Sequence, residues 1–172
     1  MRMFTHRPLR NLAMGLVLAL ALTEPGHSQT TNSVSGSITV VQPVLEVTKN
    51  SDLAFGSVVR PTSGSGTITI DGNTGTVTTS NLVRIGTSAT RASFSITGQA
   101  NANIQVTAPS TITLTRTGGA ETLSIAVTST MGGGQISSGG TASFYLGGQA
   151  TLQSTTVPGG YTGVFNVTVA YN

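Results

Sequence analysis

Apolar and polar residues alternate along the last fourteen residues of the chain, Gly159 to Asn172. From Tyr161 onward the odd-numbered residues are apolar, aromatic or glycine, and the even-numbered ones are smaller or more polar. Side chains on a strand alternate between two faces, so this pattern predicts a long β-strand with one face in a core. Chain ends usually fray unless something holds them, and an apolar strand at this position therefore needs a structural reason. That reason is the main sequence clue to function.

Short runs with the same two-residue period recur along the rest of the chain. Their bias towards Val, Ile and Thr is typical of pleated, half-buried surfaces. We expect turns at Lys49–Asp52, Asp71–Asn73, Gly118–Gly119 and Gly147–Gly148, the last three as hairpin turns. The predicted strands span residues 34–41, 44–47, 67–70, 76–79, 82–85, 92–97, 104–107, 112–116, 123–127, 142–146, 150–153 and the terminal segment.

About ten short strands at this spacing, without helical periodicity, favour an all-β fold. We predict an immunoglobulin-like β-sandwich. Residues 42–172 form the sandwich domain, and residues 29–41 form an N-terminal extension. Pro43 separates the extension from the strand that follows it, because proline removes a backbone donor and bends the chain.

Residues 1–28 have the pattern of a secretory signal peptide. Three arginines precede an apolar run from Leu12 to Leu22, and Pro25 with small residues follows it. A membrane-spanning helix needs about 20 apolar residues, and this run of 11 is too short. We therefore expect cleavage near Ser28 and export through the Sec route.

Charge and cysteine content exclude several functional classes once residues 1–28 are set aside. The remaining segment keeps five basic and four acidic residues, a net charge of +1. This is no basic surface for nucleic acid or anionic membranes. The chain has no cysteine, so no disulfide stabilises it in an oxidising compartment.

The chemical inventory also argues against catalysis. Both histidines, His6 and His27, lie in the predicted signal peptide. The rest of the chain thus has no imidazole base, no thiolate and no histidine ligand for a metal. Asp71-Gly72-Asn73 lacks the further carboxylates of a calcium loop and is better explained as a hairpin turn. We expect no enzymatic activity, no cofactor, no metal and no small-molecule substrate.

Three blocks of sequence carry a resemblance to a known family. They are Leu53-x-Phe55-Gly56-x-Val58, Phe94-Ser95-Ile96-Thr97-Gly98, and Pro158-Gly159-Gly160-Tyr161-x-Gly163-x-Phe165-x-Val167-x-Val169-x-Tyr171. The chain resembles the bacterial secreted domain of unknown function 4402 family, which in turn resembles the archaic, spore-coat-U-like subunits of chaperone–usher pili. Such pilins share the penultimate aromatic residue and the glycine fourteenth from the end. Many of them have a disulfide, which this chain lacks.

The resemblance implies an incomplete sandwich that a donor strand from another chain completes. A sandwich without its last strand leaves an apolar groove with unpaired backbone edges, and strand addition satisfies both. The expected donor residues are Val34, Gly36, Ile38 and Val40. The expected groove residues are Gly159, Tyr161, Gly163, Phe165, Val167, Val169 and Tyr171. The implied partners are a periplasmic chaperone, an outer-membrane usher and identical subunits in a fimbrium, with the chain passing through the periplasm to the cell surface.

Other interpretations remain open from the sequence. Val34, Ile38 and Val40 would also suit an ordinary first strand within their own domain, because sequential strands usually pair locally. A self-contained secreted adhesin or matrix protein would have the same composition. A small outer-membrane barrel would also end in an alternating strand, but it needs two aromatic girdles, and the seven aromatics after residue 28 are too few.

Overall fold

The computed structural model describes residues 32–40, 43–130 and 132–172. It divides the chain into two units, Met1–Thr39 and Val40–Asn172, each of which is described by itself. The predicted signal peptide and residues 29–31, 41 and 42 lie outside the described residues.

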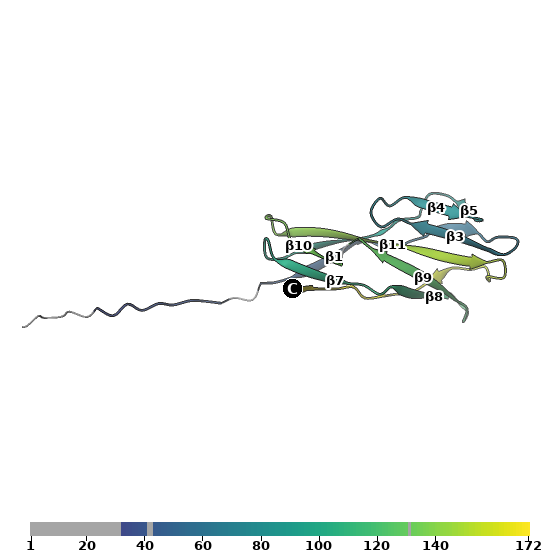
Figure 1. Ribbon diagram of the computed structural model, residues 1–172. Coiled ribbons are helices and arrows are strands. Elements are labelled where there is room, and N and C mark those ends of the chain that lie inside the picture. The colour runs from purple at the N-terminus through teal and green to yellow at the C-terminus, as the bar shows by residue number, and fades with distance from the viewer. Residues whose placement is uncertain (1–31, 41–42, 131) are drawn as a thin grey trace, which may run out of the picture. The chain divides into compact units, whose positions relative to one another are not determined.

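Every regular element among the described residues is a β-strand, which confirms the all-β prediction (Figure 1). The strands are β1 (Glu46–Ser51), β2 (Ser57–Val59), β3 (Ser65–Ile70), β4 (Val77–Ser80), β5 (Val83–Ile85), β6 (Ala92–Thr97), β7 (Asn103–Thr107), β8 (Thr111–Arg116), β9 (Thr122–Ser129), β10 (Gly133–Gln135), β11 (Thr141–Gln153), β12 (Tyr161–Thr162) and β13 (Thr168–Tyr171).

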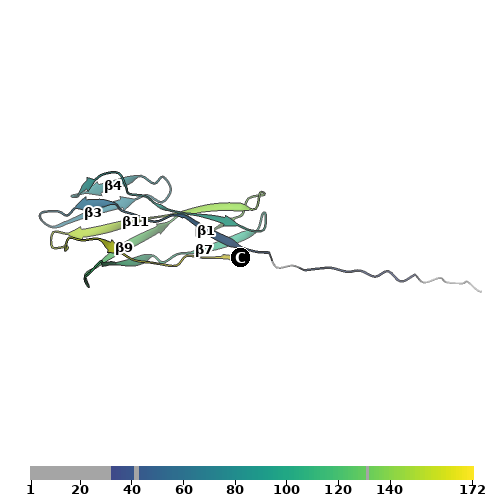
Figure 2. The ribbon, with the colours of Figure 1, turned by 180° about the vertical axis from the view of Figure 1, so that it is seen from behind.

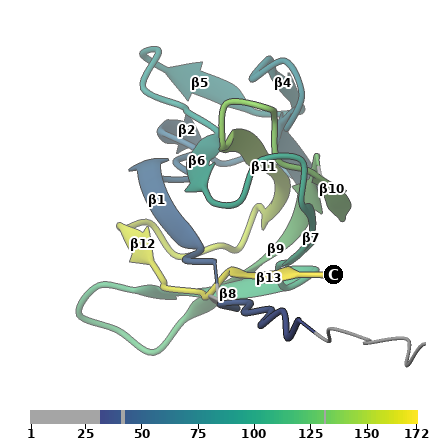
Figure 3. The same ribbon diagram turned by 90° about the vertical axis from the view of Figure 1, so that its left-hand side faces the viewer.

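The strands of the second unit form a β-sandwich. The main sheet has the order β1-β6-β11-β9-β8-β12, with β3 paired to β11 and β4 to β3. A second sheet has the order β10-β7-β13, and β2 and β5 form a two-stranded ribbon. Figure 2 shows the same strands from behind. In the end view of Figure 3 the strands curl round, and β1 and β12, the two ends of the main strand order, lie on the same side.

Strand β11 is longer than predicted and passes through Gly147 and Gly148. Its first half pairs with β6, its middle with β9 and its second half with β3, so one strand joins the two ends of the sandwich. The predicted hairpin turn at these glycines is therefore wrong. A Cβ atom at Gly147 would overlap the carbonyl oxygen of Ile70 and the amide of Gly72, so glycine is needed here for close backbone approach.

The core has two clusters of buried side chains, one towards each end of β11. In the first cluster the rings of Phe94 and Phe144 stack with centroids 4.6 Å apart. The second is centred on Ile68 and Ile125. Leu53 and Phe165, together with Val127, pack against both clusters. The chain segments before β2 and before β13 are thereby attached to the whole core.

The hairpin predicted at Asp71-Gly72-Asn73 is confirmed, because β3 pairs with β4 in the register Ile70↔Val77. Asp71 Oδ1 accepts a hydrogen bond of 2.7 Å from the Thr74 amide. This bond is the main reason that the pKa of the Asp71 carboxyl lies below its ordinary value. Arg91 also donates to the carbonyl oxygen of Gly72 at 2.8 Å and lies 3.7 Å from the ring centroid of Tyr145.

Acidification should weaken the β3–β4 turn. A carboxyl whose pKa is lower in the folded chain adds stability above its unfolded pKa, and this is lost as the pH falls through the folded value. We expect the urea midpoint to fall below about pH 4, the ordinary range of a carboxyl pKa. Asp71→Asn should unfold more easily at pH 7 and lose less stability on acidification. Equal acid sensitivity in both proteins would show that Asp71 does not contribute.

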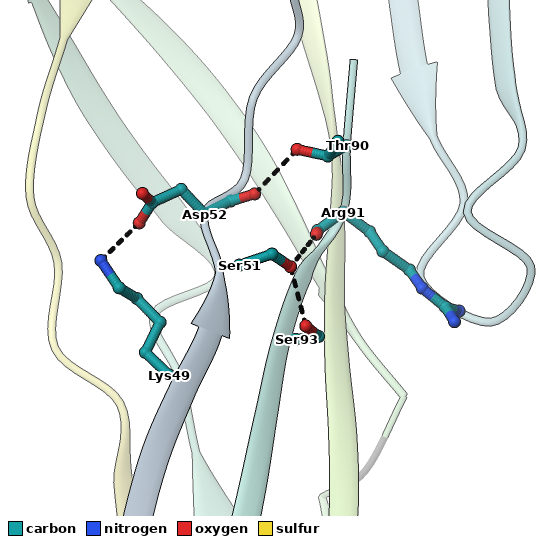
Figure 4. A network of polar contacts seen from close by, with 6 residues as sticks. All are labelled: Lys49, Ser51, Asp52, Thr90, Arg91 and Ser93. Atoms are coloured by element: carbon teal, nitrogen blue, oxygen red, sulfur yellow. Dashed lines mark hydrogen bonds and ion pairs between the residues drawn. The ribbon is translucent and has the colours of Figure 1, made fainter. Parts of the chain in front are cut away.

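Strand β1 extends to Ser51, inside the predicted turn at Lys49–Asp52, so that prediction is wrong, and the strand predicted over residues 44–47 lies instead at Glu46–Ser51. The pairing with β6 changes register between Lys49 and Ser51, which is an irregularity and not a chain reversal. Figure 4 shows the side chains that hold this end of β1. Ser51 Oγ donates to the Arg91 carbonyl oxygen at 2.9 Å, and Thr90 Oγ1 donates to the Asp52 carbonyl oxygen at 3.1 Å.

Candidate strand-binding groove

An apolar groove lies between two separate segments of the domain. Residues 53–60, which follow β1, form its first wall, and residues 156–163, which lead into and include β12, form its second wall. The groove has a volume of about 960 Å³. Its floor is Ile68, Leu114, Leu123, Ile125, Ala150 and Leu152.

The groove lies at an open seam of the fold. By seam we mean the line between the two walls, along which strand edges have no partner. Among the described residues β1 pairs only with β6, and β12 pairs only with β8. In the same described part of the chain, the ribbon strand β2 pairs only with β5, and β13 pairs only with β7. Each wall therefore has a strand edge without a partner, and the unpaired backbone groups of such an edge can accept another strand.

The predicted alternation of the terminal segment is confirmed, whereas the single long strand is not. From Phe165 to Tyr171 the odd-numbered side chains are half-buried, and the even-numbered ones are exposed. However, β12 pairs with β8 and β13 with β7, and residues 163–167 between them belong to no strand. The terminal segment crosses from β8 to β7, so residues 163–167 have no continuous neighbouring strand.

The glycines of the second wall have structural reasons of their own. Gly159 has φ 153°, a backbone conformation that favours glycine. A Cβ atom there would lie 2.9 Å from Arg116 Cδ. A Cβ atom at Gly163 would lie 2.5 Å from the Thr113 carbonyl oxygen and 3.0 Å from Leu114 Cδ2. Both glycines thus let the second wall lie close to β8.

Arg116 and Glu121 form an ion pair beside the second wall. Arg116 Nε lies 2.7 Å from Glu121 Oε2, and the two residues flank the β8–β9 turn at Gly118–Gly119 predicted from sequence. Their hydrogen bond raises the pKa of Arg116 and lowers that of Glu121. Both side chains are partly exposed, so the pair orients Arg116 against Gly159 and contributes little to stability.

Two hydrogen-bonded contacts join the chain on either side of the seam. At one end Tyr171 Oη donates to the Val44 carbonyl oxygen at 3.1 Å and accepts from the Gln99 amide at 2.8 Å. At the other, Arg60 Nη1 donates to the Thr156 carbonyl oxygen at 2.8 Å. A Cβ atom at Gly98 would lie 2.6 Å from Tyr171 Oη, so the Tyr171 end is filled by the chain itself.

The sequence identified one part of this groove and missed another. Phe55 and Gly56 belong to a block quoted for the family resemblance, and Gly56 has φ 71°, a left-handed backbone conformation that favours glycine. Phe55 and Val58 pack against the second core cluster and also line the first wall, a role that we did not assign to them. Arg60 was likewise missed, because only the fold brings it to Thr156.

The candidate donor residues lie in a segment without regular structure. Residues 32–40 contain no strand, so the strand predicted over residues 34–41 is not formed in its described part. Val34, Ile38 and Val40 are 93%, 88% and 85% exposed. A β-strand requires a partner for its backbone groups, and alternation alone does not supply one.

The curled sheets define the protein as a member of the all-β sandwich class. A family described as a domain of unknown function, DUF4402, matches residues 45–171. The chain therefore belongs to this family. Comparisons with curated proteins and with solved structures gave no match. Among the described residues, no helix has the length and apolar character needed to cross a membrane.

Proposed function

We propose that this protein is a fimbrial structural subunit that assembles by strand donation. The supporting observation is the apolar groove between two unpaired strand edges. An exposed apolar groove is an association site, and an added strand would cover its floor and pair with its edges. The role is structural and not catalytic.

The donor is the N-terminal extension of a second copy, whose exposed residues alternate with the period that a groove requires. Burying Val34, Ile38 and Val40 would contribute about 5–9 kcal/mol. Each main-chain hydrogen bond would add about 1 kcal/mol. Donation from one copy to the next is a head-to-tail contact that does not close, so it produces a filament.

The position of Val44 sets the direction of the donor. Val44 lies beside Tyr171, at the end of the seam opposite Arg60 and Thr156. When all copies point the same way, the extension of one copy enters the next groove from its Arg60 end. Val40 then lies near that end and Val34 farther in, so the donor runs antiparallel to the terminal segment.

A periplasmic chaperone and an outer-membrane usher complete the proposal. The open groove is an exposed apolar surface, and the chaperone would cover it until the donor strand binds. Export through the Sec route would bring the chain to the periplasm, and assembly at the usher would carry it to the cell surface.

Deletion of residues 29–41 tests the proposal. In a secreting bacterium supplied with the chaperone and usher genes, the chain with its extension should form SDS-resistant ladders, whereas the deletion variant should stay monomeric and folded. A full-length monomer whose deletion variant loses its fold would instead show that the extension is an internal strand, as in a self-contained adhesin.

A further inference from the structure

The charged side chains of the second unit fall into two groups. Six of them lie beside an opposite charge: Lys49 with Asp52, Arg116 with Glu121, and Arg91 with Asp71. The other three have no ion-pair partner among the described residues: Glu46, Arg60 and Arg84. One acidic and two basic side chains are therefore left without an opposite charge inside a single copy.

Glu46 and Arg60 lie at opposite ends of the domain. Glu46 pairs across the sheet with Thr97, whose other neighbour, Thr141, begins β11. Arg60 is bonded to Thr156, which follows the far end of β11 (Figure 1). A strand of 13 residues spans about 40 Å, several times the Debye length of about 10 Å, so these two charges cannot pair within one copy.

We propose that Glu46 of one copy forms an ion pair with Arg60 of the next copy in the filament. This inference rests on the proposed strand donation and adds a second contact, between the sandwich domains themselves. When all copies point the same way, the end of one domain that carries Val44 and Glu46 faces the Arg60 end of the next. The two unpaired, opposite charges are thus brought to the same junction.

The extension itself offers no acidic partner to Arg60. Arg60 is the one charged residue among those described that line the groove. From residue 29 to residue 45 the chain has no charged side chain, so Glu46 is the first carboxylate of the donor copy. Val40 lies near the Arg60 end in the proposed complex, and the six residues that follow it span about 20 Å at most. Glu46 therefore lies no farther than this from the mouth of the groove.

The guanidinium of Arg60 is available for a second partner. Its Nη1 atom donates to the Thr156 carbonyl oxygen at 2.8 Å, and its side chain is exposed. The other N–H groups of the guanidinium can donate to both oxygens of one carboxylate. Because the bond to Thr156 already restrains Arg60, less side-chain freedom is lost when Glu46 binds. Glu46 is exposed as well, on an edge strand.

The ion pair would select the direction in which copies join. Arg84 pairs across the ribbon with Val58, two residues before Arg60, so both unpaired arginines lie on neighbouring strands. Two copies that met through these ends would bring like charges together, as would two copies that met through Glu46. Like charges at an interface disfavour an arrangement, and opposite charges favour it. The head-to-tail arrangement alone joins an acidic end to a basic one.

Zero-length coupling with a carbodiimide reports this pair, because the reagent joins a carboxylate to an amine only where the two are in contact. Arg60→Lys supplies the amine and keeps the charge. The natural lysine, Lys49, pairs with Asp52 of its own copy, and the parent chain measures the background coupling. Arg84→Lys is the matched control, since it adds the same amine near this end but outside the groove.

Ladders of the full-length chain, assembled as above, are treated with the reagent and boiled in SDS so that only covalent links remain. We expect at least fivefold more covalent dimer from Arg60→Lys than from Arg84→Lys, and we expect Glu46→Gln to remove the excess. No excess, an excess that survives Glu46→Gln, or coupling to a different protein would overturn the pair and leave strand donation intact. Ladders that survive deletion of residues 29–41 would overturn strand donation and the pair with it.

A charge exchange tests the same contact without a reagent. Glu46→Arg should slow ladder formation at least threefold, because it places two cations at the junction, and adding Arg60→Glu should restore the parent rate. A double variant that assembles no faster than Glu46→Arg alone would contradict the pair.

Discussion

Replacing Ile38 by aspartate should reduce assembly at least about 100-fold. In the proposed complex this side chain enters the apolar groove, and no charged residue is among the six that form its floor. Removing a carboxylate from water without a partner costs several kcal/mol, and each 1.4 kcal/mol is a factor of ten in association. The measurement is the fraction of chain in SDS-resistant ladders at matched expression.

Thr39→Asp is the matched control for Ile38→Asp. It adds the same charge one residue later, on the donor face that would point to solvent, and should leave assembly within about twofold, because an exposed charge costs little. Equal loss in both variants would mean that charge anywhere in the extension blocks assembly. Equal assembly of Ile38→Asp and the parent chain would contradict insertion of this side chain into the groove.

Local sequence patterns correctly predicted the strands in which one face is clearly apolar and the other is more polar. β6 begins and ends at the predicted residues, 92 and 97, because Ala92, Phe94 and Ile96 face the core and the residues between them do not. The β3–β4 hairpin was predictable for a similar reason, since Asp71 supplies both the turn and the hydrogen-bond acceptor that fixes it.

Contacts between distant residues decided the elements that the sequence did not predict. A Gly-Gly pair is compatible with a turn and also with close approach of a neighbouring backbone, and only the position of Ile70 and Gly72 distinguishes the two at Gly147. Lys49 and Asp52 are typical turn residues, yet pairing with β6 keeps β1 extended as far as Ser51. In both cases tertiary pairing overrides local preference.

For a related reason, the sequence allowed only one part of the groove to be predicted. The terminal segment, which begins in the second wall, has a two-residue period from Tyr161 onward that can be recognised in one stretch of sequence. The first wall and the floor come from segments far apart in the chain, and Leu114, Leu123 and Arg60 have no local pattern that assigns them to a shared surface. The apolar period indicated that a face is buried, while the fold determines which residues lie opposite it.

Gly147→Ala should destabilise the folded domain by about 3 kcal/mol and lower its melting temperature by about 10 °C, because overpacking against backbone atoms that cannot move aside is costly. The added methyl group would overlap the carbonyl oxygen of Ile70 and the amide of Gly72, at the point where β11 changes partners from β6 to β3. Thermal and urea unfolding of the purified domain would measure the change.

Gly139→Ala provides the control for this substitution, since the nearest atom to its Cβ would be Ser137 Oγ at 3.7 Å and its φ is not positive. We expect this variant to unfold within about 0.5 kcal/mol of the parent, as alanine also reduces the freedom of the unfolded chain. If Gly147→Ala were as stable as Gly139→Ala, β11 could not be the continuous strand that joins the two core clusters. The bend would then have to be a flexible turn with room for a side chain, as the sequence pattern alone suggested.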